Sequence, residues 1–327
     1  MEFRTEIKLD KSKILIDPKD KILSLGSCFA DNIGDYFEKY RFEILKNPFG
    51  VLYNPASIYN LLNIVHEEKI FTQDDLIFDQ EEWHSFYHHS NFSSHNVMQV
   101  LDNINTNQLK VKKYLPGADV VIITLGTSIV YEYKQTKNIV ANCHKIPAEK
   151  FNKIKLSLEE VINYLQKTIT LLKTYNKNIK IVFTVSPVRH WKDGAVENHI
   201  SKSILLLAII NVLNENIMYF PSYEIMMDDL RDYRFYKQDK IHPNETAVEY
   251  IWEKFSGVMF TANCLDLMNK IERINDALNH RPRNIKSEKH QIFIRRQINI
   301  IKELINTYPH LKMDEDIKYF ESQLILE

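Results

Sequence analysis

The sequence has few cysteines, no excess of either charge and no long hydrophobic run. Its 3 cysteines, Cys28, Cys143 and Cys264, are odd in number and widely spaced in 327 residues. This pattern fits neither a disulfide framework nor a zinc site. The 42 basic and 43 acidic residues leave a net charge of -1, so composition gives no argument for nucleic acid or an anionic membrane as a partner.

The shortage of hydrophobic runs excludes further classes of protein. Residues 1–10 contain both acidic and basic side chains, so we expect no signal peptide at this end. No apolar run has the length that a transmembrane helix needs. Together with the cysteine usage, this predicts a cytoplasmic protein in a reducing compartment.

Short apolar runs alternate with segments of helical periodicity. Apolar runs predict strands at about 22–26, 42–45, 118–125, 179–185 and 217–220. The intervening segments predict helices, of which the one that begins at Ser157 has the Ser-x-x-Glu capping box. Repeated strand–helix–strand order predicts a three-layer α/β/α fold around a five-stranded parallel sheet.

The chain length is enough for one large domain with an appendage. We expect an α/β domain over 1–260, with an insertion of weak periodicity at about 67–118. Amphipathic helices, the clearest at about 291–308, predict a helical extension over 261–327.

Ser27 stands where the first predicted strand gives way to a helix. Gly26 allows the chain to turn sharply, and the start of the helix offers unpaired N–H groups and a partial positive charge. These features suit a nucleophile whose reaction develops an anion. The alternative is that Ser27 only caps the helix, since serine is a preferred N-cap residue.

A serine nucleophile needs a base and a group that orients the base. Asp239 and His242 come just before the predicted helix at about 244–255. In this interpretation His242 accepts the proton of Ser27 and Asp239 holds the imidazole. The alternative is an ordinary acidic residue and histidine in a surface loop.

The segment Gly26-Ser27-Cys28-Phe29-Ala30 resembles the motif that names the GSCFA family, which is placed with the SGNH hydrolases, or GDSL-type esterases. Further stretches over about 20–255 are similar to the same family: Asn47-Pro48-Phe49-Gly50, Leu125-Gly126-Thr127-Ser128, Asn142-Cys143-His144-Lys145, Ser186-Pro187-Val188-Arg189, Tyr219-Phe220-Pro221-Ser222-Tyr223-Glu224 and Asp239-Lys240-Ile241-His242-Pro243. The resemblance implies an SGNH-like, flavodoxin-like fold. It also implies a catalytic triad of Ser27, His242 and Asp239.

The same resemblance implies an oxyanion hole that includes the backbone N–H groups of Ser27 and Gly50. The wider superfamily adds an asparagine in a Gly-x-Asn-Asp motif, where this chain reads Gly126-Thr127-Ser128-Ile129. Thr127 or Ser128 can donate in its place, or Asn142 can reach in from the following loop. Loss of such a donor costs other serine hydrolases about 10²- to 10³-fold in rate.

Other polar residues near the predicted strand ends are candidates for binding the substrate: Asn47, Thr127, His144, Arg189 and His190. Arg189 and His190 can meet a carboxylate or phosphate, or Arg189 can cap a helix or form an ion pair. Cys28 is a rival nucleophile, but we expect it to be buried.

Four histidines, His84, His88, His89 and His95, gather in the insertion. His84 and His88 would share one face of a helix, which invites a metal site. No acidic residue stands beside them at a familiar ligand spacing, so we favour imidazole and aromatic groups that line a polar pocket. We predict no metal and no cofactor.

The resulting hypothesis is a serine esterase that removes an O-acyl group, most simply acetate, from a carbohydrate or small metabolite through an acyl-serine. One alternative is an O-acyltransferase with the same triad. Another is a binding or scaffold protein that uses the C-terminal helices, whose basic residues include Arg281, Arg283 and Lys286. A small-molecule or carbohydrate ester is the only partner predicted, and the oligomeric state is left open.

Overall fold

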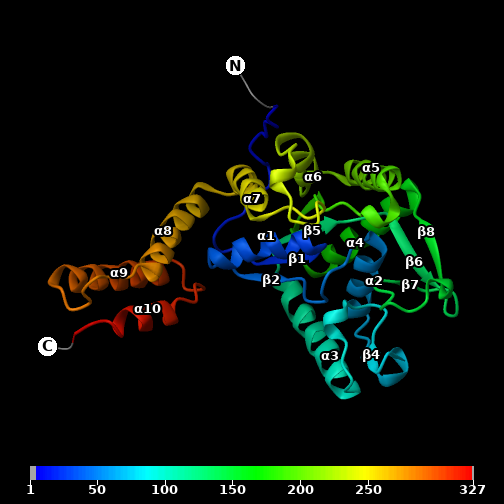
Figure 1. Cartoon of the computed structure of the whole chain (residues 1–327), viewed down its shortest axis with the longest axis horizontal. Helices are drawn as coiled ribbons and strands as arrows, with labels where there is room; N and C mark the ends of the chain where they lie inside the picture. Colours follow the sequence, from blue (N-terminus) through cyan, green and yellow to red (C-terminus); the bar gives the residue numbers. More distant parts are fainter. Residues whose placement is uncertain (1–4, 326–327) are drawn as a thin grey trace.

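A five-stranded parallel sheet forms the centre of the protein in a computed structural model that describes residues 5–325 (Figure 1). The order across the sheet is β10-β9-β5-β1-β2. The strands are β1 (Ile22–Gly26), β2 (Ile44–Lys46), β5 (Val120–Leu125), β9 (Lys180–Val185) and β10 (Ile217–Phe220). This confirms the predicted α/β fold. The order reverses between β1 and β5, the point where such sheets place their ligand sites.

Helices cover both faces of the sheet, so alternate residues of each strand enter different apolar clusters. Ile22 faces the cluster under α1 (Cys28–Lys39) and α7 (Glu245–Met259). Leu23 and Leu25 face the cluster under three other helices, α2 (Pro55–His66), α4 (Leu158–Tyr175) and α5 (Ala195–Val212). Burial on both faces explains why the strands read as unbroken apolar runs.

Helix α5 is long and apolar enough to cross a membrane by length and composition alone, which differs from the expectation of no such run. Leu205, Ala208 and Ile209 lie on one side of it and are buried against the sheet. A core helix of a globular protein has the same composition, so this helix does not test the predicted cytoplasmic location.

The insertion has more regular structure than its sequence indicates. It contains the hairpin β3 (Ile77–Asp79) and β4 (Glu82–His84), followed by α3 (Val97–Tyr114). A further antiparallel sheet, also not predicted, has the order β7-β6-β8. Its strands are β6 (Ile129–Tyr133), β7 (Ile139–Val140) and β8 (Phe151–Lys155).

The C-terminal helices are α8 (Ala262–Asn279), α9 (Glu288–Thr307) and α10 (Asp314–Glu321), on the side of the molecule away from β6–β8 (Figure 1). Their apolar residues continue the cluster under α1. Arg41 also pairs with Asp316 of α10 at 3.2 Å. The domain boundary at residue 260 stays a prediction. Residues 1–4, which belong to the segment where we expect no signal peptide, lie outside the described residues.

Candidate active site

A cavity of about 640 Å³ opens beyond the carboxyl ends of β1, β5 and β9. Its lining includes Ser27, Thr127, Asn142, His190 and His242. The β6–β8 sheet supplies one wall through side chains such as Tyr131 and Phe151. The volume lies within the range of roughly 300–1,000 Å³ that is usual for small-molecule sites.

Ser27 reaches the cavity from a turn that only glycine can form. Gly26 has φ +134°, and a Cβ atom on it would lie 2.1 Å from the backbone oxygen of Thr124. Ser27 is the N-cap of α1, and its Oγ accepts a hydrogen bond from the N–H of Phe29 at 3.3 Å. The capping role is therefore present. Ser27 lines the cavity although it is only 1% exposed, and its role as nucleophile stays a prediction.

Asp239 and His242 are joined within one loop. His242 Nδ1 and Asp239 Oδ2 are 2.6 Å apart. Asp239 Oδ1 accepts hydrogen bonds from the N–H groups of Ile241 and His242 at 2.9 and 3.0 Å. These backbone bonds, together with the imidazole, lower the pKa of Asp239 to about 2. With Nδ1 donating to this carboxylate, Nε2 carries the lone pair that a general base needs.

Ser27 and His242 line the same cavity, but no hydrogen bond joins them within residues 5–325. His242 is anchored through its main chain, since its carbonyl oxygen accepts from the N–H of Lys237 at 2.8 Å. A catalytic contact therefore requires a change of side-chain rotamer or a shift of this loop. Such contacts are often long in ligand-free enzymes.

The two backbone groups expected in the oxyanion hole already have acceptors. The N–H of Ser27 donates to Thr124 O at 3.0 Å, because the β1–β5 ladder continues one residue further. The N–H of Gly50 donates to Asn47 O at 2.8 Å and closes a turn. These two amides therefore do not form a ready oxyanion hole. The N–H of Cys28 stands at the first position of α1, where no acceptor within the helix exists.

Three side chains were candidates for the third donor, and the structure separates them. Ser128 is fully buried away from the cavity, with its N–H donating to Ser201 Oγ at 2.7 Å. Thr127 lines the cavity, but its Oγ1 is engaged with the same Ser201 hydroxyl at 2.9 Å. Asn142 lines the cavity with Oδ1 held by the N–H of His144 at 2.9 Å. Its Nδ2 has no partner in the described part of the chain, so it is the open donor.

Asn47, expected to contact substrate, instead supports the serine turn. Its Oδ1 accepts from the N–H of Gly26 at 2.9 Å and its Nδ2 donates to Asp31 at 2.8 Å. The residue is buried and lies outside the cavity lining. Its amide therefore holds the turn before Ser27 in place, a role that the sequence did not reveal.

His144, His190 and Arg189 do line the cavity. Burial lowers the pKa of His144 and of His190 to about 4 in each case, and Lys202 also acts on His190. Both rings are thus neutral near pH 7. The guanidinium carbon of Arg189 lies 4.7 Å from the centre of the Trp191 ring.

Lys202 is a buried lysine next to the cavity-lining residue Val188, and the sequence did not single it out. Its Nζ donates to the carbonyl oxygens of Ser186 and Val188 at 2.7 and 3.0 Å. Burial lowers its pKa to about 7. The sequence pattern could have identified this residue. Lys202 lies on the same apolar face of the helix as Leu205 and Ile209, where a lysine is unusual.

Two cysteines line the cavity as well. Cys28 is half-buried rather than fully buried as expected. Burial and the nearby Asp31 raise the pKa of its thiol, and burial raises the pKa of Cys143 to about 11. Neither thiol is therefore a ready nucleophile at neutral pH.

The histidine cluster is mostly structural. His84 lies in β4, not on a helix, with Nδ1 2.7 Å from Ser93 Oγ. His88 is buried with Nδ1 2.9 Å from Ser85 Oγ, and burial lowers its pKa to about 3. Of the run, His89 reaches the cavity. Over residues 5–325 no group of three or more His, Cys, Asp or Glu side chains is placed to hold a metal ion.

The fold and cavity define a doubly wound α/β protein with a serine and an Asp–His pair at the carboxyl edge of its sheet. Residues 21–255 match the GSCFA family, and residues 271–325 match the GSCFA domain protein, C-terminal domain. The chain belongs to the GSCFA family. A comparison with curated proteins finds no match.

Among solved structures, the chain is similar to a carbohydrate esterase family 3 protein from Talaromyces cellulolyticus, with 9% identity and a TM-score of 0.35. It is also similar to a mutant acetyl esterase with acetate ion, with 10% identity and a TM-score of 0.35. Each likeness covers 78% of this chain and 99% of the other. At these values the similarity does not bear on function.

Proposed function

We propose that this protein is a serine esterase that removes an O-acyl group, with acetate as the acyl part, from a carbohydrate or small metabolite. The observation that carries the proposal is the Asp239–His242 pair, 2.6 Å apart, on the same cavity that Ser27 lines. In this arrangement an imidazole held by a carboxylate shares a cavity with a serine at a helix N-terminus.

The proposed reaction begins when Ser27 Oγ attacks the ester carbonyl carbon. His242 Nε2 accepts the hydroxyl proton and then gives it to the alcohol as the acyl–oxygen bond breaks. Water, deprotonated by His242, then attacks the acyl-serine, and the proton returns to Ser27 as acetate leaves. Asp239, with its pKa lowered to about 2, stays ionised and stabilises the imidazolium throughout.

The negative charge that develops on the carbonyl oxygen needs donors. The start of α1 supplies the N–H of Cys28 and the positive end of the helix. Asn142, which lines the same cavity, supplies its Nδ2 as a side-chain donor. Together they replace the superfamily asparagine that is missing after β5.

The test is the kcat/KM for 4-nitrophenyl acetate and for acetylated monosaccharides. We expect Ser27→Ala and His242→Ala to lower it by at least about 10³-fold, and Asp239→Asn by about 10²- to 10⁴-fold. Ser24→Ala is the matched control, because Ser24 is buried in β1 but does not line the cavity. Full activity in Ser27→Ala, or equal losses in both serine variants, contradicts the proposal.

Product analysis distinguishes hydrolysis from acyl transfer, because both use the same acyl-enzyme. Free acetate as the main product in the presence of excess glycerol supports the esterase. An acetylated alcohol as the main product shows an acyltransferase instead. A folded wild type with no Ser27-dependent turnover favours a scaffold protein.

A further inference from the structure

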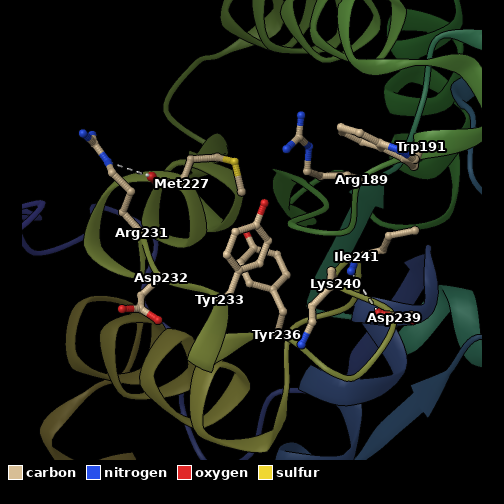
Figure 2. Close-up of a pocket in the computed structure, with 10 residues that line it drawn as sticks. All are labelled: Arg189, Trp191, Met227, Arg231, Asp232, Tyr233, Tyr236, Asp239, Lys240 and Ile241. Carbon is tan, nitrogen blue, oxygen red and sulfur yellow. Dashed lines mark hydrogen bonds between the residues drawn. The ribbon is translucent and has the colours of Figure 1, made fainter.

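Figure 2 shows a second cavity, of about 610 Å³. The two share Arg189, Trp191 and Ile241. The second cavity also reaches Asp239, whose partner His242 lines the first. The Asp–His loop therefore stands between them, and an ester seated at Ser27 can extend its alcohol part into the second cavity.

Three aromatic side chains, Trp191, Tyr233 and Tyr236, line this second cavity together with charged residues. Tyr233 is 72% exposed and Trp191 is 51% exposed. Tyr233 and Tyr236 have ring centres 6.0 Å apart and lie at the middle of the cavity, with Met227 on one side and Arg189 on the other (Figure 2). The flat rings of tyrosine and tryptophan can cover the C–H face of a ligand, while the hydroxyl or N–H group of the side chain stays in contact with water. A pyranose ring has such a face.

Arg189 adds a positive charge that the protein does not neutralise. In the described chain no carboxylate lies within ion-pair distance of it, and its buried Nε has no hydrogen-bond partner. The cavity's Arg231 differs, since it pairs with Asp228 at 2.6 Å. The guanidinium lies over Trp191 and its Nε is buried, so the two terminal Nη groups, which have no hydrogen-bond partner in residues 5–325, are left for a planar acceptor such as a carboxylate.

We propose that the second cavity binds an acidic sugar, a pyranose with a carboxylate, as the alcohol part of the ester. The ring lies on Trp191 and Tyr233, and the carboxylate binds Arg189. This inference rests on the proposed esterase function. Lys240 also lines the cavity, so a phosphate is the competing anion, and the aromatic rings that can cover a sugar ring favour the uronate.

Binding tests the inference without any turnover. Calorimetry with Ser27→Ala protein compares methyl glucuronide with methyl glucoside. We expect the uronate to bind at least about tenfold more tightly, and Arg189→Gln to remove that preference. Tyr233→Ala, at an exposed position that does not threaten the fold, should weaken both ligands. Arg234→Gln is the matched control for Arg189→Gln. Arg234 is next to Tyr233 in the chain, but it pairs with Asp232 and does not line the cavity.

Equal binding of the two glycosides, an unchanged preference in Arg189→Gln, or tighter binding of inorganic phosphate than of the uronate would overturn the inference.

Measurements of turnover then distinguish a failure of this inference from a failure of the proposed esterase function. For acetylated methyl glucuronide against acetylated methyl glucoside, the ratio of kcat/KM should fall about tenfold in Arg189→Gln and hold in Arg234→Gln. Esterase activity that depends on Ser27 without a uronate preference refutes the inference alone. A uronate preference in binding without such activity refutes the proposed function alone.

Discussion

Replacing Gly26 by alanine should destabilise the protein more than any other glycine substitution considered below. A Cβ atom at Gly26 would lie 2.1 Å from Thr124 O and 2.8 Å from both Thr124 C and N. All three are backbone atoms of the neighbouring strand β5, so no side-chain rotation relieves the contact. The φ of +134° adds strain, because L side chains rarely adopt it.

The magnitude follows from two contributions. Backbone strain of this kind costs about 1–3 kcal/mol. Moving β1 away from β5 weakens the ladder at this point, including the bond from Ser27 N–H to Thr124 O at 3.0 Å, and each such bond contributes about 0.5–1.5 kcal/mol. Loss of two or three bonds together with the strain gives about 2–7 kcal/mol, a large part of a typical stability of about 5–15 kcal/mol.

Two other glycines provide controls. Gly194 has φ +85° and ψ 160° with no atom within 4 Å of a Cβ, so alanine there should cost only the backbone strain, about 1–3 kcal/mol. Gly257 lies inside α7 in open space, where alanine should stabilise the helix by about 0.5–1 kcal/mol. Urea unfolding followed by far-UV circular dichroism measures all three. A loss below about 1 kcal/mol for Gly26→Ala, or a larger loss for Gly194→Ala, refutes the reasoning.

Three further predictions concern the cavity. Asn142→Ala should lower kcat about 10²- to 10³-fold with little change in KM, if its amide binds the developing oxyanion; a change confined to KM contradicts this. The free energy of unfolding should rise with pH from about 7 to 9, because the unfolded chain keeps the proton of Lys202 that the folded protein, with a pKa of about 7, releases. Lys202→Met should flatten that rise in urea titrations, and an unchanged slope would assign it to other groups. Cys28→Ala should retain esterase activity, and iodoacetamide should alkylate Cys28 slowly at pH 7, because burial raises the pKa of its thiol; rapid alkylation would show an activated thiolate.

The sheet was predictable because its strands are buried on both faces. Such strands read as apolar runs whatever surrounds them, as in Val120–Leu125. Helix α4 was equally clear, since Ser157 and Glu160 form the capping box that the sequence indicates.

Helix α3 was missed for a physical reason. Its buried positions are Val100, Ile104, Gln108 and Val111, so a glutamine interrupts the apolar stripe. The β6–β8 sheet was missed because β7 has only 2 residues and the sheet is partly exposed. A strand of 2 residues carries no readable period, and β6 and β8, with 5 residues each, include polar residues and are not unbroken apolar runs.

The candidate site also has parts that the sequence predicts and parts that it does not. Local motifs gave the Ser27 turn and the Asp239–His242 pair, because each depends on neighbours in the chain. The engagement of Gly50 N–H by Asn47 and the burial of Ser128 against Ser201 depend on tertiary packing. Spacing along the chain does not encode these contacts. The aromatic second cavity likewise assembles from segments about 40 residues apart, at Trp191 and Tyr233.

The most direct test of the central claim is the site of covalent labelling by a fluorophosphonate, which reacts with an activated serine hydroxyl. Intact-mass and tryptic peptide analysis should show one adduct per chain, on Ser27 within the peptide of residues 22–39. His242→Ala should abolish the adduct, and Ser24→Ala should retain it. An adduct on any other residue, or folded wild-type protein that never labels, contradicts the account.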